Sequence, residues 1–394
     1  MIKKAVKDVD SFIIEERYGG YDPYDALNSD IIRKIPSKFF KLAFTQIFVY
    51  SPINFRKIFK VTKNENPKGL GLILRANCNL YRCGILDSNQ FQNRVDEIDK
   101  ILMEIRSEGY SGYSWGYNFP WQDITRYLEK YIPSIVNTST ISNAYLDLYE
   151  ITKNKRYLDI ARGTCEFIIN DLNVFENKYG SCFSYTPIDN NVVHNANLMG
   201  AEILSRVGSK TGKFEYIKLV KIGTDFFLAY QKKDGRWGYK KKKKKGTERM
   251  QIDFHQGFVL DSLICLQQNI EGLKIDSKIK KGANFYFGRQ FRNGMTLWRY
   301  PRRLPKDIHH QAQGVITSYK MYELFKDEIY KVIHLKILQR LIKDFTKGKK
   351  VTYQKWFFNN NIQYIRWAHA WTLLGLSYSM KLFTESNSDN IGSS

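Results

Sequence analysis

The sequence lacks the features that mark small secreted, zinc-binding or membrane-spanning proteins. Its five cysteines are scattered and form no CxxC pair, so they indicate neither a disulfide framework nor a zinc site. No stretch approaches the roughly 18 uninterrupted apolar residues of a membrane span, and the first residues contain no apolar run typical of a secretion signal. No HExxH-type ligand spacing is present. We therefore expect a cytoplasmic protein with no metal and no cofactor.

A linker is also missing, because no Pro/Ser-rich tract interrupts the chain and the 43% of apolar residues are spread evenly. Acidic residues are in short supply: 62 Lys and Arg stand against 39 Asp and Glu, a net charge of +23. This excess favours a polyanion, an anionic lipid surface, or a phosphorylated or carboxylated substrate. No nucleic-acid-binding motif accompanies the charge, so we expect no nucleic acid partner. The run Lys240 to Lys245 is interpreted as a solvated loop, with an anion clamp as the alternative.

What the sequence does contain is an internal repeat. A glycine followed by an aromatic-x-Tyr pattern recurs at intervals of roughly 50–70 residues, which suits a unit of two helices and two loops. The copies are Gly112 with Trp115-Gly116-Tyr117, Gly180 with Phe183-Ser184-Tyr185, Gly235 with Trp237-Gly238-Tyr239, Gly294 with Trp298-Arg299-Tyr300, and a weaker Gly348 with Val351-Thr352-Tyr353.

Each copy follows a basic amphipathic segment and precedes a less charged helix rich in small residues, as expected for outer and inner helices of a ring. The predicted outer helices are 91–107, 155–172, 214–231, 275–291 and 331–346, and the inner helices are 138–152, 194–207, 255–269, 309–325 and 367–381. A sixth hairpin is expected from residues 26–50 (outer) and 68–83 (inner). Six hairpins predict an all-α (α/α)6 toroid over residues 1–385, followed by a flexible polar tail, 386–394. The aromatic and basic residues 39–59 are interpreted as an outer helix, with contact to a bilayer surface as the alternative.

In this geometry the repeat loops meet at one mouth of the ring, where the inner helices begin. Five of the six histidines fall at equivalent helix starts, and imidazoles supply acid or base chemistry near neutral pH. Aspartates recur there too, as glycoside hydrolysis by a carboxylate pair requires, although Asp is also a common helix cap. The candidate catalytic residues are Asp123, Asp189, His194, Asp253, His255, Asp307 and His310.

Aromatic and polar side chains near the same mouth suit sugar recognition, because aromatic faces stack on the C–H faces of sugar rings. The alternative is that each aromatic wedges neighbouring hairpins together. The candidate substrate-binding residues are Trp115, Tyr117, Trp121, Gln122, Tyr185, Asn195, Asn197, Trp237, Tyr239, Trp298, Arg299, Tyr300, Gln311, Gln313, Trp367 and His369.

Several motifs in this order resemble one known family. They are Gly20-Tyr21-Asp22-Pro23-Tyr24, Trp115-Gly116-Tyr117-Asn118-Phe119-Pro120-Trp121-Gln122, Asp253-Phe254-His255-Gln256-Gly257-Phe258 and Asp307-Ile308-His309-His310-Gln311. The chain resembles the VpsJ-like polysaccharide-biosynthesis proteins. The resemblance implies a toroid related to six-hairpin glycosidases, in a prokaryotic capsule, exopolysaccharide or O-antigen pathway, and it implies no particular reaction.

Together these observations predict a carbohydrate-active enzyme acting on an anionic glycan or glycolipid intermediate in surface polysaccharide synthesis. A hydrolase would use two of the aspartates, whereas a uronate lyase or C5-epimerase would use His and Tyr, with Arg neutralising the carboxylate. The alternative is a non-catalytic glycan-binding or scaffold protein. The expected partners are a saccharide and, peripherally, the inner membrane face or a synthesis complex. The sugar, the linkage and the oligomeric state stay open.

Overall fold

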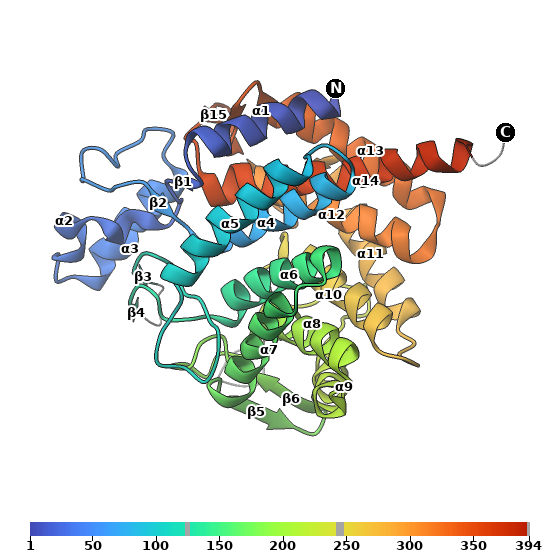
Figure 1. Cartoon of the computed structure of the whole chain (residues 1–394). Coiled ribbons are helices and arrows are strands. Elements are labelled where there is room, and N and C mark those ends of the chain that lie inside the picture. Colours follow the sequence, from blue (N-terminus) through green and yellow to red (C-terminus); the bar gives the residue numbers. More distant parts are fainter. Residues whose placement is uncertain (123–126, 242–247, 392–394) are drawn as a thin grey trace.

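The inner ring of the fold consists of six helices that are packed on nearly all sides. A computed structural model describes residues 1–122, 127–241 and 248–391. Consecutive inner helices pack against each other and the last returns to the first, which closes the ring (Figure 1). In α6 every residue from Ile135 to Leu148 is buried. The six inner helices are α4 (Pro67–Arg82), α6 (Ile135–Thr152), α8 (His194–Thr211), α10 (His255–Asn269), α12 (Ile308–Phe325) and α14 (Trp371–Ile391).

An outer layer of amphipathic helices surrounds this ring. In α5 the buried residues Phe91, Val95, Ile98 and Leu102 recur at helical spacing and face α4. A capping box at Asp87 and Gln90 fixes where this helix begins. The outer helices are α1 (Ile2–Glu15), α5 (Ser88–Glu104), α7 (Lys155–Asn170), α9 (Phe214–Leu228), α11 (Asp276–Gln290) and α13 (Glu328–Arg340). The predicted (α/α)6 toroid is thus confirmed.

The first hairpin differs from the prediction, because its outer helix is α1 and not the segment 26–50. Helix α1 packs against α14. Residues 21–63, here called the insertion lobe, lie between α1 and α4 and contain α2 (Asp30–Arg33) and α3 (Lys38–Tyr50). The lobe has a small core of its own around Leu27, Ile32 and Phe48. Short strands β1 (Gly19–Gly20) and β2 (Asn64–Glu65) pair at its base, and the lobe projects to one side of the ring (Figure 1).

The repeat loops carry short antiparallel hairpins at the mouth. Their glycines explain the repeat, because each passes against a carbonyl of the next outer helix. A Cβ built on Gly112 would lie 1.9 Å from the Gly163 oxygen, and the equivalent contacts in later repeats measure 2.2–2.3 Å. The weak copy at Gly348 has no such contact. The hairpins are β3 (Trp121–Gln122) with β4 (Tyr127–Leu128), β5 (Val174–Asn177) with β6 (Gly180–Phe183), β7 (Lys240–Lys241) with β8 (Glu248–Arg249), β9 (Phe291–Arg292) with β10 (Met295–Thr296), and β12 (Thr346–Lys347) with β13 (Lys350–Val351).

One further sheet orders the mouth near α12. Strand β11 (Lys306–Asp307) pairs antiparallel with β14 (Gln354–Lys355), which pairs with β15 (Asn359–Asn360). This pairing brings Gln354 opposite Asp307 at the start of α12. Between these strands and α14 lies a π-helical segment, Ile365–Ala370, which carries Arg366 and Trp367.

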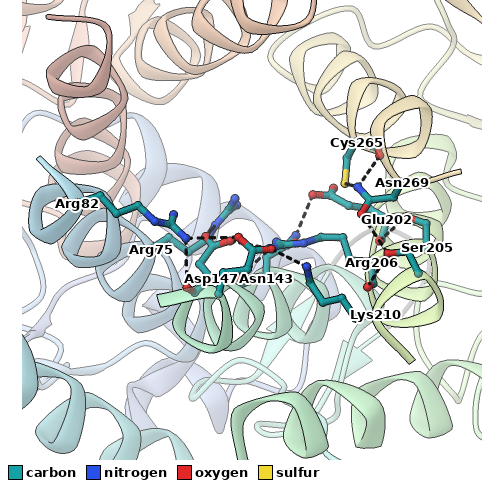
Figure 2. A network of polar contacts seen from close by, with 12 residues as sticks. Arg75, Arg82, Asn143, Asp147, Glu202, Ser205, Arg206, Lys210, Cys265 and Asn269 are labelled. Carbon is teal, nitrogen blue, oxygen red and sulfur yellow. Dashed lines mark hydrogen bonds and ion pairs between the residues drawn. The ribbon is translucent and has the colours of Figure 1, made fainter. Parts of the chain in front are cut away.

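The opposite end of the ring, called the closed end below, carries a network of ion pairs between inner helices beside a smaller cavity of about 270 Å³ (Figure 2). Arg206 of α8 binds Asp147 and Glu150 of α6, both at 2.8 Å. Arg75 of α4 reaches the same Asp147 at 3.0 Å. On the far side of the axis, Lys320 of α12 pairs with Asp261 of α10 at 3.2 Å. Each of these charges therefore has an opposite charge beside it.

In the described part of the chain, no helix is both long enough and apolar enough to cross a membrane. Helix α14 runs to Ile391, into the segment 386–394 that the sequence analysis separates as a tail. The division of the chain at residue 385 stays a prediction.

Candidate functional site

A cavity of about 930 Å³ opens at the mouth of the toroid. Its walls come from the repeat loops, the first turns of inner helices and one side of α3. The predicted residues that line it share a place at these helix starts or loops; they are Tyr117, Trp121, Tyr185, Asn195, Tyr239, Asp253, His255, Trp298, Arg299, Asp307 and Trp367.

Asp253 and His255 form a hydrogen-bonded pair at the start of α10. The Asp253 Oδ1 atom lies 2.5 Å from His255 Nδ1, and its Oδ2 accepts from Gln251 at 2.8 Å. Burial alone would raise the pKa of Asp253, but His255, Arg299 and Gln251 outweigh it and the pKa is lowered. The ionised carboxylate therefore fixes the ring of His255, which leaves Nε2 as the nitrogen available to a ligand.

Asp307 at the start of α12 is a carboxyl group that forms no ion pair within residues 1–122, 127–241 and 248–391. It accepts hydrogen bonds from Gln354 Nε2 at 3.0 Å, from Trp367 Nε1 at 3.0 Å and from the His309 amide at 2.9 Å. Burial raises its pKa to about 6, although these donors oppose the rise. A carboxyl group whose pKa lies nearer to neutral pH than the ordinary value is better suited to proton transfer there.

Lys68 in the first turn of α4 is a buried amine that lines the cavity, with 4% of its surface exposed. Its Nζ lies 5.5 Å from the ring centre of Phe258 and 5.7 Å from that of Trp371. No carboxylate of the described residues forms an ion pair with it, because the neighbouring Asp22 is engaged by Arg366. Burial and the positive charge of Arg366 lower the pKa of Lys68 to about 7. A helix N-terminus also disfavours a cation.

His309 is a buried imidazole that the structure leaves unpaired at the cavity wall. Its ring stacks between Phe254, at 4.2 Å, and Trp371, at 4.3 Å. Neither ring nitrogen has a hydrogen-bond partner among the described residues. Burial holds the pKa of His309 well below its ordinary value, with Lys68 and Arg366 adding to the effect. Both nitrogens are buried within the wall, so His309 contributes to the cavity as a neutral, packed ring.

The aromatic residues of the repeats divide into two groups. The tyrosines Tyr117, Tyr185 and Tyr239 face the cavity, as does Tyr353 of the weak copy. The tryptophans Trp115 and Trp237 are instead fully buried in the wall. The Trp115 Nε1 atom donates to the Leu102 carbonyl at 2.8 Å, so this ring wedges an outer helix against the loop.

Three predicted catalytic residues do not line the described cavity. Asp189 accepts hydrogen bonds from Thr186 and from the Asn191 amide, so it stabilises its own turn. His194 lies 3.0 Å from Glu248 within the wall. His310 stacks on Tyr286, and burial lowers its pKa to about 4. Adjacent helix positions point about 100° apart, and it is His309 that faces the cavity.

Several predicted binding residues also serve the wall and not the cavity, because their polar groups are already engaged or packed. The Gln311 amide donates to Gly294 and Ile337, and Asn197 binds both backbone groups of Phe183. The full set outside the cavity lining is Trp115, Gln122, Asn197, Trp237, Tyr300, Gln311, Gln313 and His369.

Two of these residues mark contacts between hairpins. Gln313 donates to Asp261 at 3.0 Å inside the ring, and the ring of His369 stacks on Phe12 of α1 at 4.0 Å. The candidate Asp123 and most of the run Lys240–Lys245 lie outside the described residues.

Sequence reasoning missed several residues that line the cavity. Lys68 and His309 are absent from the predicted set, as is Arg366, which stands beside Trp367 and binds Asp22 with two hydrogen bonds. Residues of the insertion lobe were assigned to an outer helix; those that line the cavity are Tyr24, Phe39, Leu42, Ala43, Gln46, Val49 and Tyr50. The motif Gly20-Tyr21-Asp22-Pro23-Tyr24 was a usable sign that this lobe reaches the site.

Comparisons with known proteins identify the fold. No family model matches the sequence, and no curated protein matches it. Among solved structures, the chain is similar to a glycoside hydrolase family 76 mannosidase from Bacteroides thetaiotaomicron, with 13% identity, coverage of 98% of this chain and 99% of that one, and a TM-score of 0.66.

A heparin-specific unsaturated glucuronyl hydrolase is similar at 15% identity, 97% coverage of both chains and a TM-score of 0.65. A cellobiose 2-epimerase from Bacillus thermoamylovorans follows at 11% identity, 97% and 99% coverage and a TM-score of 0.63. At these identities the likeness shows the shared six-hairpin toroid alone.

Proposed function

We propose that this chain is a carbohydrate-active enzyme that performs acid–base chemistry on an anionic saccharide in the mouth cavity. The observation that carries the proposal is the presence of two complementary groups in one cavity: the His255–Asp253 pair and Asp307, whose pKa burial raises to about 6. Environments that push the pKa values of two titratable groups apart are typical of acid and base partners.

The charges that line the cavity support an anionic substrate. The described lining contains five cations, Lys68, Lys240, Arg249, Arg299 and Arg366, and two carboxylates, Asp253 and Asp307. Arg366 is neutralised by Asp22, whereas Lys68 has no ion-pair partner in the described chain. A substrate carboxylate beside Lys68 would supply that partner and raise the pKa of the amine.

Of the two reaction types considered, proton abstraction from a uronate is the better supported. Both oxygens of Asp253 are occupied by His255, Gln251 and Arg299, so Asp253 orients the imidazole and is poorly placed as a nucleophile. His255 Nε2 would remove the C5 proton, and a cation would stabilise the negative charge that develops on the carboxylate. Asp307 would return a proton to C5 in an epimerase. In a lyase it would protonate the C4 oxygen as the C4–O bond breaks, leaving a 4,5-unsaturated uronate.

Glycoside hydrolysis is the second candidate, favoured by the raised pKa of Asp307. Asp307 would protonate the glycosidic oxygen, and His255 would take a proton from the attacking water. The names of the structural neighbours, a glucuronyl hydrolase and an epimerase among them, support both reaction types. The resemblance to VpsJ-like proteins supports a place in surface polysaccharide synthesis.

The test is an incubation of purified protein with uronate-containing and neutral oligosaccharides in heavy water, followed by NMR and mass spectrometry. Deuterium at C5 or an unsaturated product, lost in His255→Ala, would establish epimerase or lyase chemistry. Chain cleavage without C5 exchange, lost in Asp307→Asn, would establish a hydrolase. Asp189→Asn, outside the cavity, is the matched control and should retain activity. Saturable binding without any turnover would contradict the proposal and favour a glycan-binding protein.

A further inference from the structure

The insertion lobe carries an excess of basic residues. Between residues 30 and 63 the sequence contains eight Lys and Arg and a single acidic residue, Asp30. Arg56 is buried against Asp25 at 2.8 Å, so it fixes the lobe internally. The other seven are exposed or half-buried: Arg33, Lys34, Lys38, Lys41, Lys57, Lys60 and Lys63.

Large apolar side chains are exposed among these cations. Helix α3 has three faces: Phe44 and Phe48 pack into the lobe core, Leu42 and Ala43 border the cavity, and Phe40 and Ile47 face solvent. Phe40 and Ile47 are seven residues apart, so they share one side of the helix. Exposed apolar side chains continue along the lobe at Ile31, Phe39, Ile53 and Ile58.

The β14–β15 hairpin extends this surface. Asn360 Nδ2 donates to the Ser51 carbonyl at 2.9 Å, which holds the hairpin beside the end of α3. The ring of Trp356 lies 6.3 Å from that of Tyr50. At the hairpin tip Phe357 is 95% exposed and Phe358 is also exposed. The rim of the cavity thus presents aromatic and aliphatic side chains from two separate segments.

We propose that the insertion lobe and the β14–β15 tip dock the rim of the cavity onto an anionic lipid bilayer. Exposed aromatic side chains interleaved with lysines match a bilayer interface, where rings enter the headgroup region and cations contact anionic headgroups. A second copy of this chain fits poorly, because two lobes with seven surface cations each would repel one another. The lobe projects from the ring, so its surface can approach a flat partner (Figure 1). This inference is independent of the reaction in the cavity.

The test is co-sedimentation of the full chain with vesicles of 30% phosphatidylglycerol in phosphatidylcholine, beside pure phosphatidylcholine vesicles. We expect binding to the anionic vesicles that weakens with added salt. Phe40→Ser with Ile47→Ser should weaken that binding at least tenfold, because two apolar anchors are lost. Lys34→Gln with Lys57→Gln should weaken it by about fivefold for each charge removed. None of these four residues lines the cavity, so turnover of a soluble saccharide should not change.

The matched control is Phe214→Ser with Ile329→Ser, which changes exposed residues at the starts of outer helices α9 and α13. This variant should bind vesicles as the wild type does. Equal binding by the lobe variants, or no binding to anionic vesicles, would overturn the proposal. A wild-type dimer in light scattering that Phe40→Ser with Ile47→Ser converts to a monomer would also overturn it. If Phe40→Ser with Ile47→Ser does not fold, Lys34→Gln with Lys57→Gln still tests the proposal.

Discussion

The two ends of the toroid both bury titratable side chains, but the pKa values of these side chains shift in different directions at the two ends. At the closed end, Arg75, Arg206 and Asp147 lie within 3.0 Å of an opposite charge. Burial opposes the charged forms of these groups, but their partners outweigh it: the pKa of Arg206 is raised and that of Asp147 is lowered. These groups are held in the charged state at every physiological pH, which suits a structural network.

At the mouth, Arg366 and Asp253 also have charged partners, but Lys68 and Asp307 form no ion pair within the described residues. Burial lowers the pKa of Lys68 to about 7, whereas Lys320 at the closed end has a raised pKa because Asp261 outweighs the effect of burial. Burial likewise raises the pKa of Asp307 to about 6. Burial is common to both ends, and for the two lysines the presence of a counter-charge decides the direction of the pKa shift; Asp261 itself keeps a raised pKa, because burial outweighs Lys320 there. Two groups at the mouth, Lys68 and Asp307, therefore have pKa values close to neutral pH, the range that suits proton transfer.

The largest expected effect is on catalysis at the mouth. Asp307→Asn should lower turnover of the saccharide substrate about 10²–10⁴-fold, because it removes the proton donor while keeping the side-chain shape. Asp147→Asn at the closed end should leave turnover per folded molecule unchanged. Steady-state rates of both variants check this. A comparable loss of turnover in Asp307→Asn and Asp147→Asn would contradict the assignment of catalysis to the mouth.

The next effect concerns stability at the closed end. Asp147→Asn leaves Arg75 and Arg206 without their shared carboxylate, so the free energy of unfolding should fall by about 3–5 kcal/mol. Urea unfolding followed by circular dichroism measures the change. Asp189→Asn, which alters a turn near the mouth, should lower the free energy of unfolding by a smaller amount. A change below about 1 kcal/mol for Asp147→Asn would mean that the network contributes little.

A pH dependence of stability should follow from Asp307. Its pKa is raised in the folded protein, so the proton is bound more tightly there than in the unfolded chain. Its contribution to stability is therefore present below about pH 4 and is lost as pH rises through about 6, a change of about 3 kcal/mol. The difference in unfolding free energy between the wild type and Asp307→Asn should change by this amount over pH 4–7. A flat difference would show that Asp307 has an ordinary pKa.

The smallest effect is on ligand affinity. Lys68→Met should weaken binding of a uronate-containing oligosaccharide about 10- to 100-fold, because one charge-assisted hydrogen bond is lost. Binding of a neutral oligosaccharide should change little. Calorimetric titration of both ligands measures this, with Lys320→Met as the control at the closed end. An equal loss for the neutral ligand would indicate a packing defect.

Much of the fold could be predicted from the sequence, because inner and outer helices differ in composition and the repeat glycines mark the loops. The exception was α1, since no Gly–aromatic–Tyr copy lies between it and α4. The insertion lobe was assigned to the ring because α3 has the same amphipathic, basic composition as an outer helix.

The site was predicted less completely, for physical reasons. Asp253, His255 and Asp307 were found because they stand at helix starts. The predicted set contains His310, whereas His309 lines the cavity. A shift of one residue in the assumed helix position turns a side chain by about 100°, which is enough to move it out of the cavity. Lys68 stands out because its neighbour Asp22 binds another residue. That residue is Arg366, more than 300 positions further along the chain. Such long-range pairing leaves no local pattern in the sequence.

We predict that Lys68 gains a carboxylate partner only when an anionic saccharide binds at the mouth. The most direct measurement is an NMR titration of lysine Cε resonances in protein labelled with ¹³C-lysine, with Lys68→Met to assign the signal. We predict one resonance that titrates near pH 7, is absent from Lys68→Met and shifts to higher pH when a uronate-containing oligosaccharide is added. Titration of every lysine near the ordinary value of about 10.4, with or without the ligand, would contradict the account.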